Sequence, residues 1–185
     1  MTIRKTLAWH YHSDAMDFLR RFSMLPPEDF SKSGRVKNFV DVVLAAECIL
    51  KAHIFMGRSE EAAITIYRSA RRMGHDIAAL AAAADYLDDR APYEAVAVRL
   101  NGIPIALRYS LDMWETFFPA LEAQEQTELY DRTVANSVWR RQAVTEVEAL
   151  IELLSPALTG EVESFDEVFQ HELDMAEFVR EARIR

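Results

Sequence analysis

The chain has 185 residues, half of them hydrophobic, and a net charge of −9. This composition is too apolar for a disordered protein, and the length suits one domain, which we take to span residues 1–185. Phosphate contacts dominate affinity for nucleic acid, so an acidic chain is not expected to bind DNA in general. No apolar run approaches the roughly 20 residues that cross a bilayer, so no membrane association is expected.

The charge is unevenly distributed along the chain. Residues 1–75 hold 12 Lys and Arg against 8 Asp and Glu, whereas residues 76–185 hold 9 against 22. A basic face in the first part can therefore bind an anion while the acidic part stays in solvent. The single cysteine, Cys48, has no disulfide partner, and the first residues do not resemble a secretory signal. We expect a soluble, cytoplasmic protein in which Cys48 is a small core residue.

Apolar positions at helical spacing predict four helices in the first part of the chain. Their expected ranges, in order, are 6–22, 36–57, 59–73 and 75–87. The first is expected to end before Pro26-Pro27, because neither ring can continue a helix. The third is expected to begin at Ser59, whose hydroxyl can cap the helix, and the second to stop at Gly57.

Glu47 interrupts the apolar stripe of the second expected helix. A carboxylate in such a position needs a partner or an open cavity, because burying it alone is costly. We therefore include Glu47 among the candidate binding residues.

Between Glu94 and Arg108 the pattern changes to period two around Asn101-Gly102, a strong hairpin signal. A two-residue turn would give three cross-strand pairs on one face: Leu100 with Ile103, Val98 with Ile105, and Val96 with Leu107. The sequence therefore predicts a small β-hairpin that lies on the helices.

Helical spacing returns after the hairpin. Thr127 is expected to cap a long helix that closes near Pro156, and Ser164 with Glu167 forms a capping box for the last helix. No low-complexity linker divides the chain. The predicted fold is all-α: an antiparallel up-and-down helical bundle with a small β-hairpin insertion around Asn101-Gly102.

A cluster of charged residues lies where the third expected helix meets the fourth; its members are Arg68, Arg71, Arg72, His75 and Asp76. Three guanidiniums beside the start of a helix can bind phosphate or carboxylate, and His75 can move a proton near neutral pH. The alternative is structural: His75 and Asp76 cap the fourth helix, and the arginines balance the acidic half of the chain.

Metal and cofactor motifs are not found. His171-Glu172 lacks the second histidine of the zinc-hydrolase pattern, and the five glycines are scattered singly rather than in a phosphate loop. We therefore predict no metal site and no cofactor.

The sequence resembles prokaryotic HEPN domains over roughly residues 36–110. The resemblance rests on Glu47-x-x-Leu50-Lys51-Ala52, on Gly57, and on Gly74-His75-Asp76-Ile77-x-x-Leu80; the segment Leu107-Arg108-Tyr109 is similar to a short insertion in some members. It implies a small up-and-down bundle, frequent homodimers and RNA- or nucleotide-directed roles, with many members acting as metal-independent endoribonucleases, toxins or phage-defence components.

The candidate site residues follow from the cluster and the resemblance together. The candidate catalytic residues are His75, Arg68 and Arg72, and the candidate ligand-binding residues are Arg71, Asp76, Glu47, Lys51 and Arg108. Cleavage of RNA needs a base for the ribose 2′-OH and a cation for the charge on the phosphorane. His75 with an arginine can supply both.

The sequence departs from the active members of that family, which carry an arginine and, after a short interval, a histidine on a late helix. The only histidine in the second half is His171, and no arginine precedes it at that spacing. Arg68 and His75 are separated by six residues, but this histidine belongs to the structural motif in the resemblance. We therefore expect a protein that acts on or senses RNA or nucleotide, non-catalytic or weakly catalytic, and homodimeric.

A protein-interaction scaffold is the alternative. Gly57 to Ala63, with Tyr67 and Ala70, is similar to part of a tetratricopeptide helix pair, although no repeat recurs at the period of about 34 residues that such proteins show. The aromatic residues Trp114, Phe117, Phe118 and Trp139 fit either the core or a dimer interface.

Overall fold

The computed structural model describes residues 2–25, 30–117, 123–159 and 165–183. In these residues the chain forms nine α-helices, one 3₁₀ helix and no β-strand, so the all-α class is confirmed. The elements are α1 Ile3–Met24, α2 Lys32–Gly57, α3 Ala63–Met73, α4 Ile77–Ala83, α5 Ala91–Leu100, η2 Ile105–Arg108, α6 Ser110–Phe117, α7 Ala123–Arg132, α8 Ser137–Leu158 and α9 Phe165–Arg183. Within the described ranges, none of these helices has the length and apolar character needed to cross a membrane.

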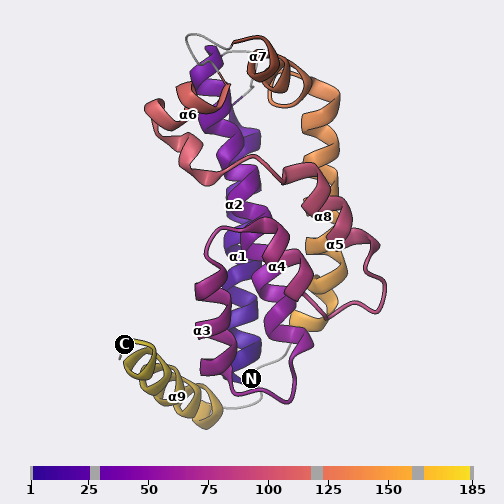
Figure 1. Cartoon of the computed structure of the whole chain (residues 1–185). Helices are drawn as coiled ribbons and strands as arrows, with labels where there is room; N and C mark the ends of the chain where they lie inside the picture. The colour runs from indigo at the N-terminus through magenta and orange to yellow at the C-terminus, as the bar shows by residue number, and fades with distance from the viewer. Residues whose placement is uncertain (1, 26–29, 118–122, 160–164, 184–185) are drawn as a thin grey trace.

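Helix α2 lies at the centre of the arrangement. Figure 1 shows α1, α2 and α8 side by side, with α3, α4 and α5 against them, α6 and α7 at one end, and α9 at the other. Every residue from Ala45 to Phe55 is buried, which means that neighbours cover α2 on all sides along this stretch. The polar side chains within it must find their partners inside the protein.

The predicted β-hairpin is wrong, because residues 91–100 form helix α5 instead. Pro92 lies in the first helical turn together with Glu94, the arrangement that helix N-termini favour. Tyr93, Val96 and Leu100 are buried at the i, i+3 and i+7 positions of one helical face. The alternating alanines and valines at 95–98 are therefore compatible with a helix as well as with a strand.

Two further observations show why the hairpin does not form. Val98, which the hairpin would bury, is 82% exposed. Asn101-Gly102 ends α5 rather than joining two strands: Gly102 has φ +86°, the left-handed conformation that glycine adopts without strain. Ile103, Ile105 and Leu107 then pack into the core from the loop and from η2.

The long helix expected from Thr127 is two helices. Thr127 lies within α7, the chain turns after Arg132, and Asn136 caps α8 by accepting hydrogen bonds from the amides of Val138 and Trp139 at 2.9 and 3.1 Å. Pro156 lies inside α8, which ends two residues later. The cap expected at Ser164 and the stop at Pro26-Pro27 fall outside the described residues.

Helix boundaries in the first half are partly as predicted. Helix α2 does end at Gly57, where an added Cβ would collide with the Asp85 side chain and stand 2.7 Å from the backbone nitrogen of Tyr86. Helix α3 begins at Ala63 rather than Ser59, and the Ser59 hydroxyl donates a hydrogen bond to the Glu60 carboxylate instead of capping the helix.

The aromatic residues in question fall into different environments. Phe117 is buried, and Trp139 is half-buried with its ring centre 5.2 Å from that of Phe39. Trp114 is 56% exposed, and Phe118 lies outside the described residues. Two of the four therefore contribute to the core.

His53 joins three helices through its imidazole ring. The side chain is fully buried in α2; Nε2 donates to the carbonyl of Leu150 in α8 at 3.0 Å, so Nδ1 accepts from the hydroxyl of Tyr93 in α5 at 2.7 Å. The Tyr93 oxygen also accepts from the amide of Leu87 at 3.1 Å. This network uses the neutral ring, and burial lowers the pKa of His53 to about 4.

We predict that acid destabilises the fold through His53. The folded pKa lies below the ordinary value of 6.5, so the contribution is fully present above pH 6.5 and is lost as the pH falls towards 4. The free energy of unfolding should drop by roughly 2–3 kcal/mol between pH 7.5 and 4.5 on account of this residue. Urea unfolding at both pH values measures the drop.

The variant His53→Gln supplies the comparison, and exposed His10→Gln is its control. His53→Gln should be less stable at pH 7.5 but should lose less stability on acidification than wild type, whereas His10→Gln should follow wild type. An equal pH dependence in wild type and His53→Gln would contradict the assignment.

Candidate functional site

Glu47 lies in the middle of α2 with only 6% of its surface exposed. Its Oε1 atom accepts a hydrogen bond from Lys51 Nζ at 2.6 Å, one helical turn further along. Its Oε2 atom accepts a hydrogen bond from His75 Nδ1 at 2.7 Å, from the turn between α3 and α4. Glu47, which interrupts the apolar stripe of α2, therefore has the partners that a buried carboxylate needs. They are a lysine on the same helix and a histidine on the turn after α3.

Lys51 is buried between the carboxylate and an aromatic ring. The residue is 8% exposed, and its Nζ atom lies 5.9 Å from the ring centre of Tyr11 in α1. Burial raises the pKa of the Tyr11 hydroxyl to about 12, so this ring stays uncharged at neutral pH. The Glu47 carboxylate is therefore the negative charge that compensates the buried ammonium.

Cys48 is a core residue, as expected. It is 8% exposed, and burial raises the pKa of its thiol to about 12, with the neighbouring Glu47 carboxylate acting in the same direction. A thiol is nucleophilic only as the thiolate, so this side chain is inert at neutral pH.

His75 faces outward from this buried pair. Since the ionised carboxylate only accepts, Nδ1 carries the proton in the neutral ring and Nε2 has its lone pair available. The imidazole is 56% exposed. It borders a hollow of about 290 Å³, whose other polar lining residues are Asp76, Asn101 and Thr116.

The three arginines of the cluster do not act together. Arg68 turns to α9, where its guanidinium donates to the carbonyl of Glu181 at 3.5 Å and lies 4.0 Å from the carboxylate of the same residue. Arg71 and Arg72 are exposed in the last turn of α3, ahead of the turn that carries His75. The structure therefore brings Glu47, Lys51 and His75 into contact and gives Arg68 a different neighbour.

Asp76 has a structural role. Its carboxylate accepts a hydrogen bond from the amide of Ala79 at 2.9 Å and caps α4, which begins at Ile77 rather than at His75. The capping alternative is thus correct for Asp76. The first-turn amide is already engaged by a carboxylate, so the start of α4 does not offer an anion site.

Arg108 lies apart from these groups, at the end of η2. Its guanidinium stacks over the ring of Tyr109, 4.7 Å from the ring centre, and both side chains are exposed. A cation beside an aromatic face is suited to a nucleobase or a phosphate. No contact joins Arg108 to His75.

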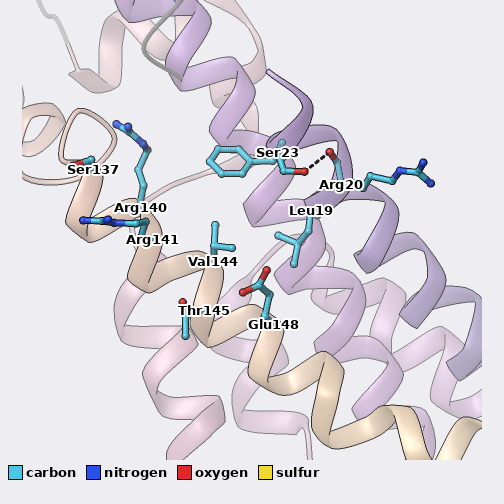
Figure 2. Close-up of a pocket in the computed structure, with 10 residues that line it drawn as sticks. Leu19, Arg20, Ser23, Ser137, Arg140, Arg141, Val144, Thr145 and Glu148 are labelled. Carbon is cyan, nitrogen blue, oxygen red and sulfur yellow. Dashed lines mark hydrogen bonds between the residues drawn. The ribbon is translucent and has the colours of Figure 1, made fainter. Parts of the chain in front are cut away.

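A larger hollow, of about 720 Å³, lies between α1 and α8 and away from the Glu47 cluster. Figure 2 shows Leu19 and Val144 facing each other across it, with Glu148 below them. The guanidinium groups of Arg20 and Arg141 extend to opposite sides, away from these apolar residues. This hollow is larger than the one beside His75, but its apolar walls do not suit a polar reaction.

Sequence reasoning did not place residues 101–104 and Thr116 beside His75. The Asn101-Gly102 turn was recognised, but it was assigned to a hairpin, so its position next to α4 was not foreseen. Among the described residues, no three His, Cys, Asp or Glu side chains are placed to hold a metal ion.

Comparison with protein-family models, with curated proteins and with solved structures finds no match to this chain.

We predict that Glu47 and Lys51 stabilise the fold only as a pair. Glu47→Leu leaves a buried ammonium without its counter-charge and should lower the free energy of unfolding by about 3–5 kcal/mol. Lys51→Leu leaves the Glu47 carboxylate with only its hydrogen bond from His75 and should lower the free energy of unfolding by a smaller amount. The double variant should recover most of this loss, because leucine at both positions buries no charge. Urea unfolding of the four proteins measures the coupling.

Glu61→Gln serves as the control. The exposed Glu61 carboxylate lies 3.8 Å from Arg58, and its removal should change the free energy of unfolding by less than about 1 kcal/mol. Additive losses in the double variant would show that Glu47 and Lys51 are not coupled.

Proposed function

We propose that the protein is an RNA- or nucleotide-directed, HEPN-like up-and-down bundle whose ligand site is centred on His75. The observation that carries the proposal is the 2.7 Å hydrogen bond from His75 Nδ1 to the Glu47 carboxylate. This bond fixes the orientation of the ring and leaves the Nε2 edge exposed beside a hollow. A histidine held in this way by a carboxylate can accept or donate a proton at Nε2.

The chemistry expected of such a site is metal-independent. Nε2 of His75 would take the proton of a ribose 2′-OH, and the 2′-oxygen would attack phosphorus. The 5′-oxygen would leave with a proton from water, which gives a 2′,3′-cyclic phosphate and a 5′-hydroxyl. The exposed guanidiniums of Arg71 and Arg72 supply positive charge on the turn before His75. Arg68 is assigned no part in the chemistry, because its guanidinium contacts α9.

The residues around His75 are better suited to binding phosphate than to cleaving RNA. Departure of the 5′-oxygen requires an acid, and among the described side chains Glu47 is the ionisable group that hydrogen-bonds His75. Glu47 is buried and already accepts hydrogen bonds from Lys51 and His75. We therefore propose binding of RNA or nucleotide as the principal activity, with cleavage slow or absent.

The proposal is tested by measuring the binding of single-stranded RNA oligonucleotides and of nucleotides to the protein, by fluorescence anisotropy in EDTA. The double variant Arg71→Glu/Arg72→Glu should weaken binding by at least about tenfold, because two phosphate-attracting charges are reversed. His75→Ala should weaken binding less and should remove any cleavage of the same RNA.

Arg20→Glu/Arg132→Glu, two exposed charge reversals on α1 and α7, controls for net charge, and His10→Ala controls for the loss of an exposed histidine. Equal losses in the Arg20/Arg132 and the Arg71/Arg72 variants would mean that binding follows overall charge. No binding by the folded wild type would refute the proposed function.

A protein-interaction scaffold is the second candidate, and the hollow between α1 and α8 is the observation that favours it. Its apolar lining residues Leu19, Phe22 and Val144 suit an apolar segment of a protein partner. Recovery of one partner in stoichiometric amount, free of RNA, together with its loss in Val144→Glu, would support this candidate over the first.

A further inference from the structure

The hollow between α1 and α8 opens where these two helices diverge. Midway along α1 the helices are in contact, because His12 Nε2 lies 3.3 Å from the carbonyl oxygen of Ile151 and 2.9 Å from the Ser155 hydroxyl. About two turns further along α1, and two turns back along α8, Leu19 and Val144 face each other across a space of about 720 Å³ (Figure 2). A space of this size can take side chains of a bound partner.

The apolar residues in this hollow are only partly covered. Leu19, Phe22 and Val144 pack against the core, yet each remains partly exposed. Every described residue that lines the hollow belongs to α1 or α8, so no third described element covers it. Apolar surface between two neighbouring helices is where a further helix packs in a bundle, and grooves of this kind bind the apolar face of an amphipathic helix.

The two sides of the hollow are basic. Arg20 on α1 and Arg141 on α8 are exposed and extend to opposite sides (Figure 2). Neither guanidinium forms an ion pair or a hydrogen bond with another described side chain, whereas Arg21, the next residue, is paired with Asp41 at 3.1 Å. In a chain with a net charge of −9, unpaired arginines on both sides of one apolar hollow are a local exception.

We propose that the hollow between α1 and α8 binds an acidic amphipathic helix of a partner protein. The apolar stripe of that helix lies on Leu19, Phe22 and Val144. Carboxylates on the two flanks of the stripe meet Arg20 on one side and Arg141 on the other. The inference rests on the second candidate function, the protein-interaction scaffold, and is independent of the site at His75.

The dimensions and the remaining charge of the hollow define the partner further. Its lining on α8 runs from Ser137 to Glu148, a length of about 16 Å, which matches about three turns of a helix. Glu148 lies below Leu19 and Val144, away from Ser137 (Figure 2). Carboxylates of the partner are repelled by Glu148, so they lie towards the Ser137 end of the hollow.

A helix fits this hollow better than a small amphipathic carboxylate such as a fatty acid. A fatty acid has one anionic group, and the guanidiniums of Arg20 and Arg141 extend away from the apolar residues rather than into the space between them (Figure 2). Carboxylates that flank the apolar stripe of a helix extend outward in the same way, on both sides at once.

Two synthetic peptides of about 18 residues test the proposal. Each carries leucine at the two apolar positions of a heptad, and the flanking positions carry glutamate in one peptide and lysine in the other. Fluorescence anisotropy of the labelled peptides measures their binding to the full chain. The glutamate peptide should bind at least about tenfold more tightly, because its charges complement Arg20 and Arg141. The net charge of −9 favours the lysine peptide, so the expected preference can come only from a local basic surface.

A charge reversal locates that surface. Arg20→Glu/Arg141→Glu should reverse the preference, so that the lysine peptide binds more tightly. Arg132→Glu/Arg183→Glu reverses two exposed charges on α7 and α9 and should keep the preference of the wild type. Far-ultraviolet circular dichroism establishes that each variant is folded. An unchanged preference in Arg20→Glu/Arg141→Glu would overturn the proposal.

Val144→Glu separates this inference from the candidate function on which it rests. Equal binding of both peptides, lost in Val144→Glu, would leave the scaffold candidate standing but overturn the acidic partner. Binding of neither peptide by the folded wild type would refute both. Binding of decanoate alone, measured by isothermal titration calorimetry, would assign the hollow to a small anion, and self-association lost in Val144→Glu would assign it to a second copy. Either result would overturn the proposal.

Discussion

The burial of α2 is the constraint on which the rest of the structure depends. From Ala45 to Phe55 every residue is buried, yet the stretch contains Glu47, Lys51 and His53. Each polar group must therefore bond within the protein. Glu47 bonds Lys51 on its own helix and His75 on the turn after α3, while His53 bonds α5 and α8. The hydrogen bonds of these buried polar groups thus connect α2 to the turn after α3, to α5 and to α8.

One of these bonds passes from the core to the surface. The Glu47 carboxylate is held from inside by Lys51, and its other oxygen orients the half-exposed imidazole of His75. A surface histidine is ordinarily free to rotate, whereas this one has a fixed donor edge and a fixed acceptor edge. The same contact therefore stabilises the fold and prepares a group for proton transfer, and this dual role links the core to the proposed ligand site.

The sequence allowed the helical class to be predicted, because it depends on local pattern, and it singled out Glu47 and His75 separately as candidate residues. The need of Glu47 for a partner followed from its place in an apolar stripe. Its pairing with His75, 28 residues away, depends on tertiary packing that no local pattern encodes. The hairpin failed because residues 94–100 fit two periods, and the first-turn Pro92 together with the buried face of Tyr93 and Leu100 favoured the helix.

The protonation pattern of the His75 ring is the most direct test of this link between core and surface. Long-range ¹H–¹⁵N correlation spectra of the protein, recorded where the ring is neutral, distinguish the two tautomers. We expect His75 as the Nδ1–H form, with the proton directed at Glu47, and we expect that preference to be lost in Glu47→Gln. An Nε2–H ring in the wild type, or a tautomer mixture typical of a solvated histidine, would contradict the account.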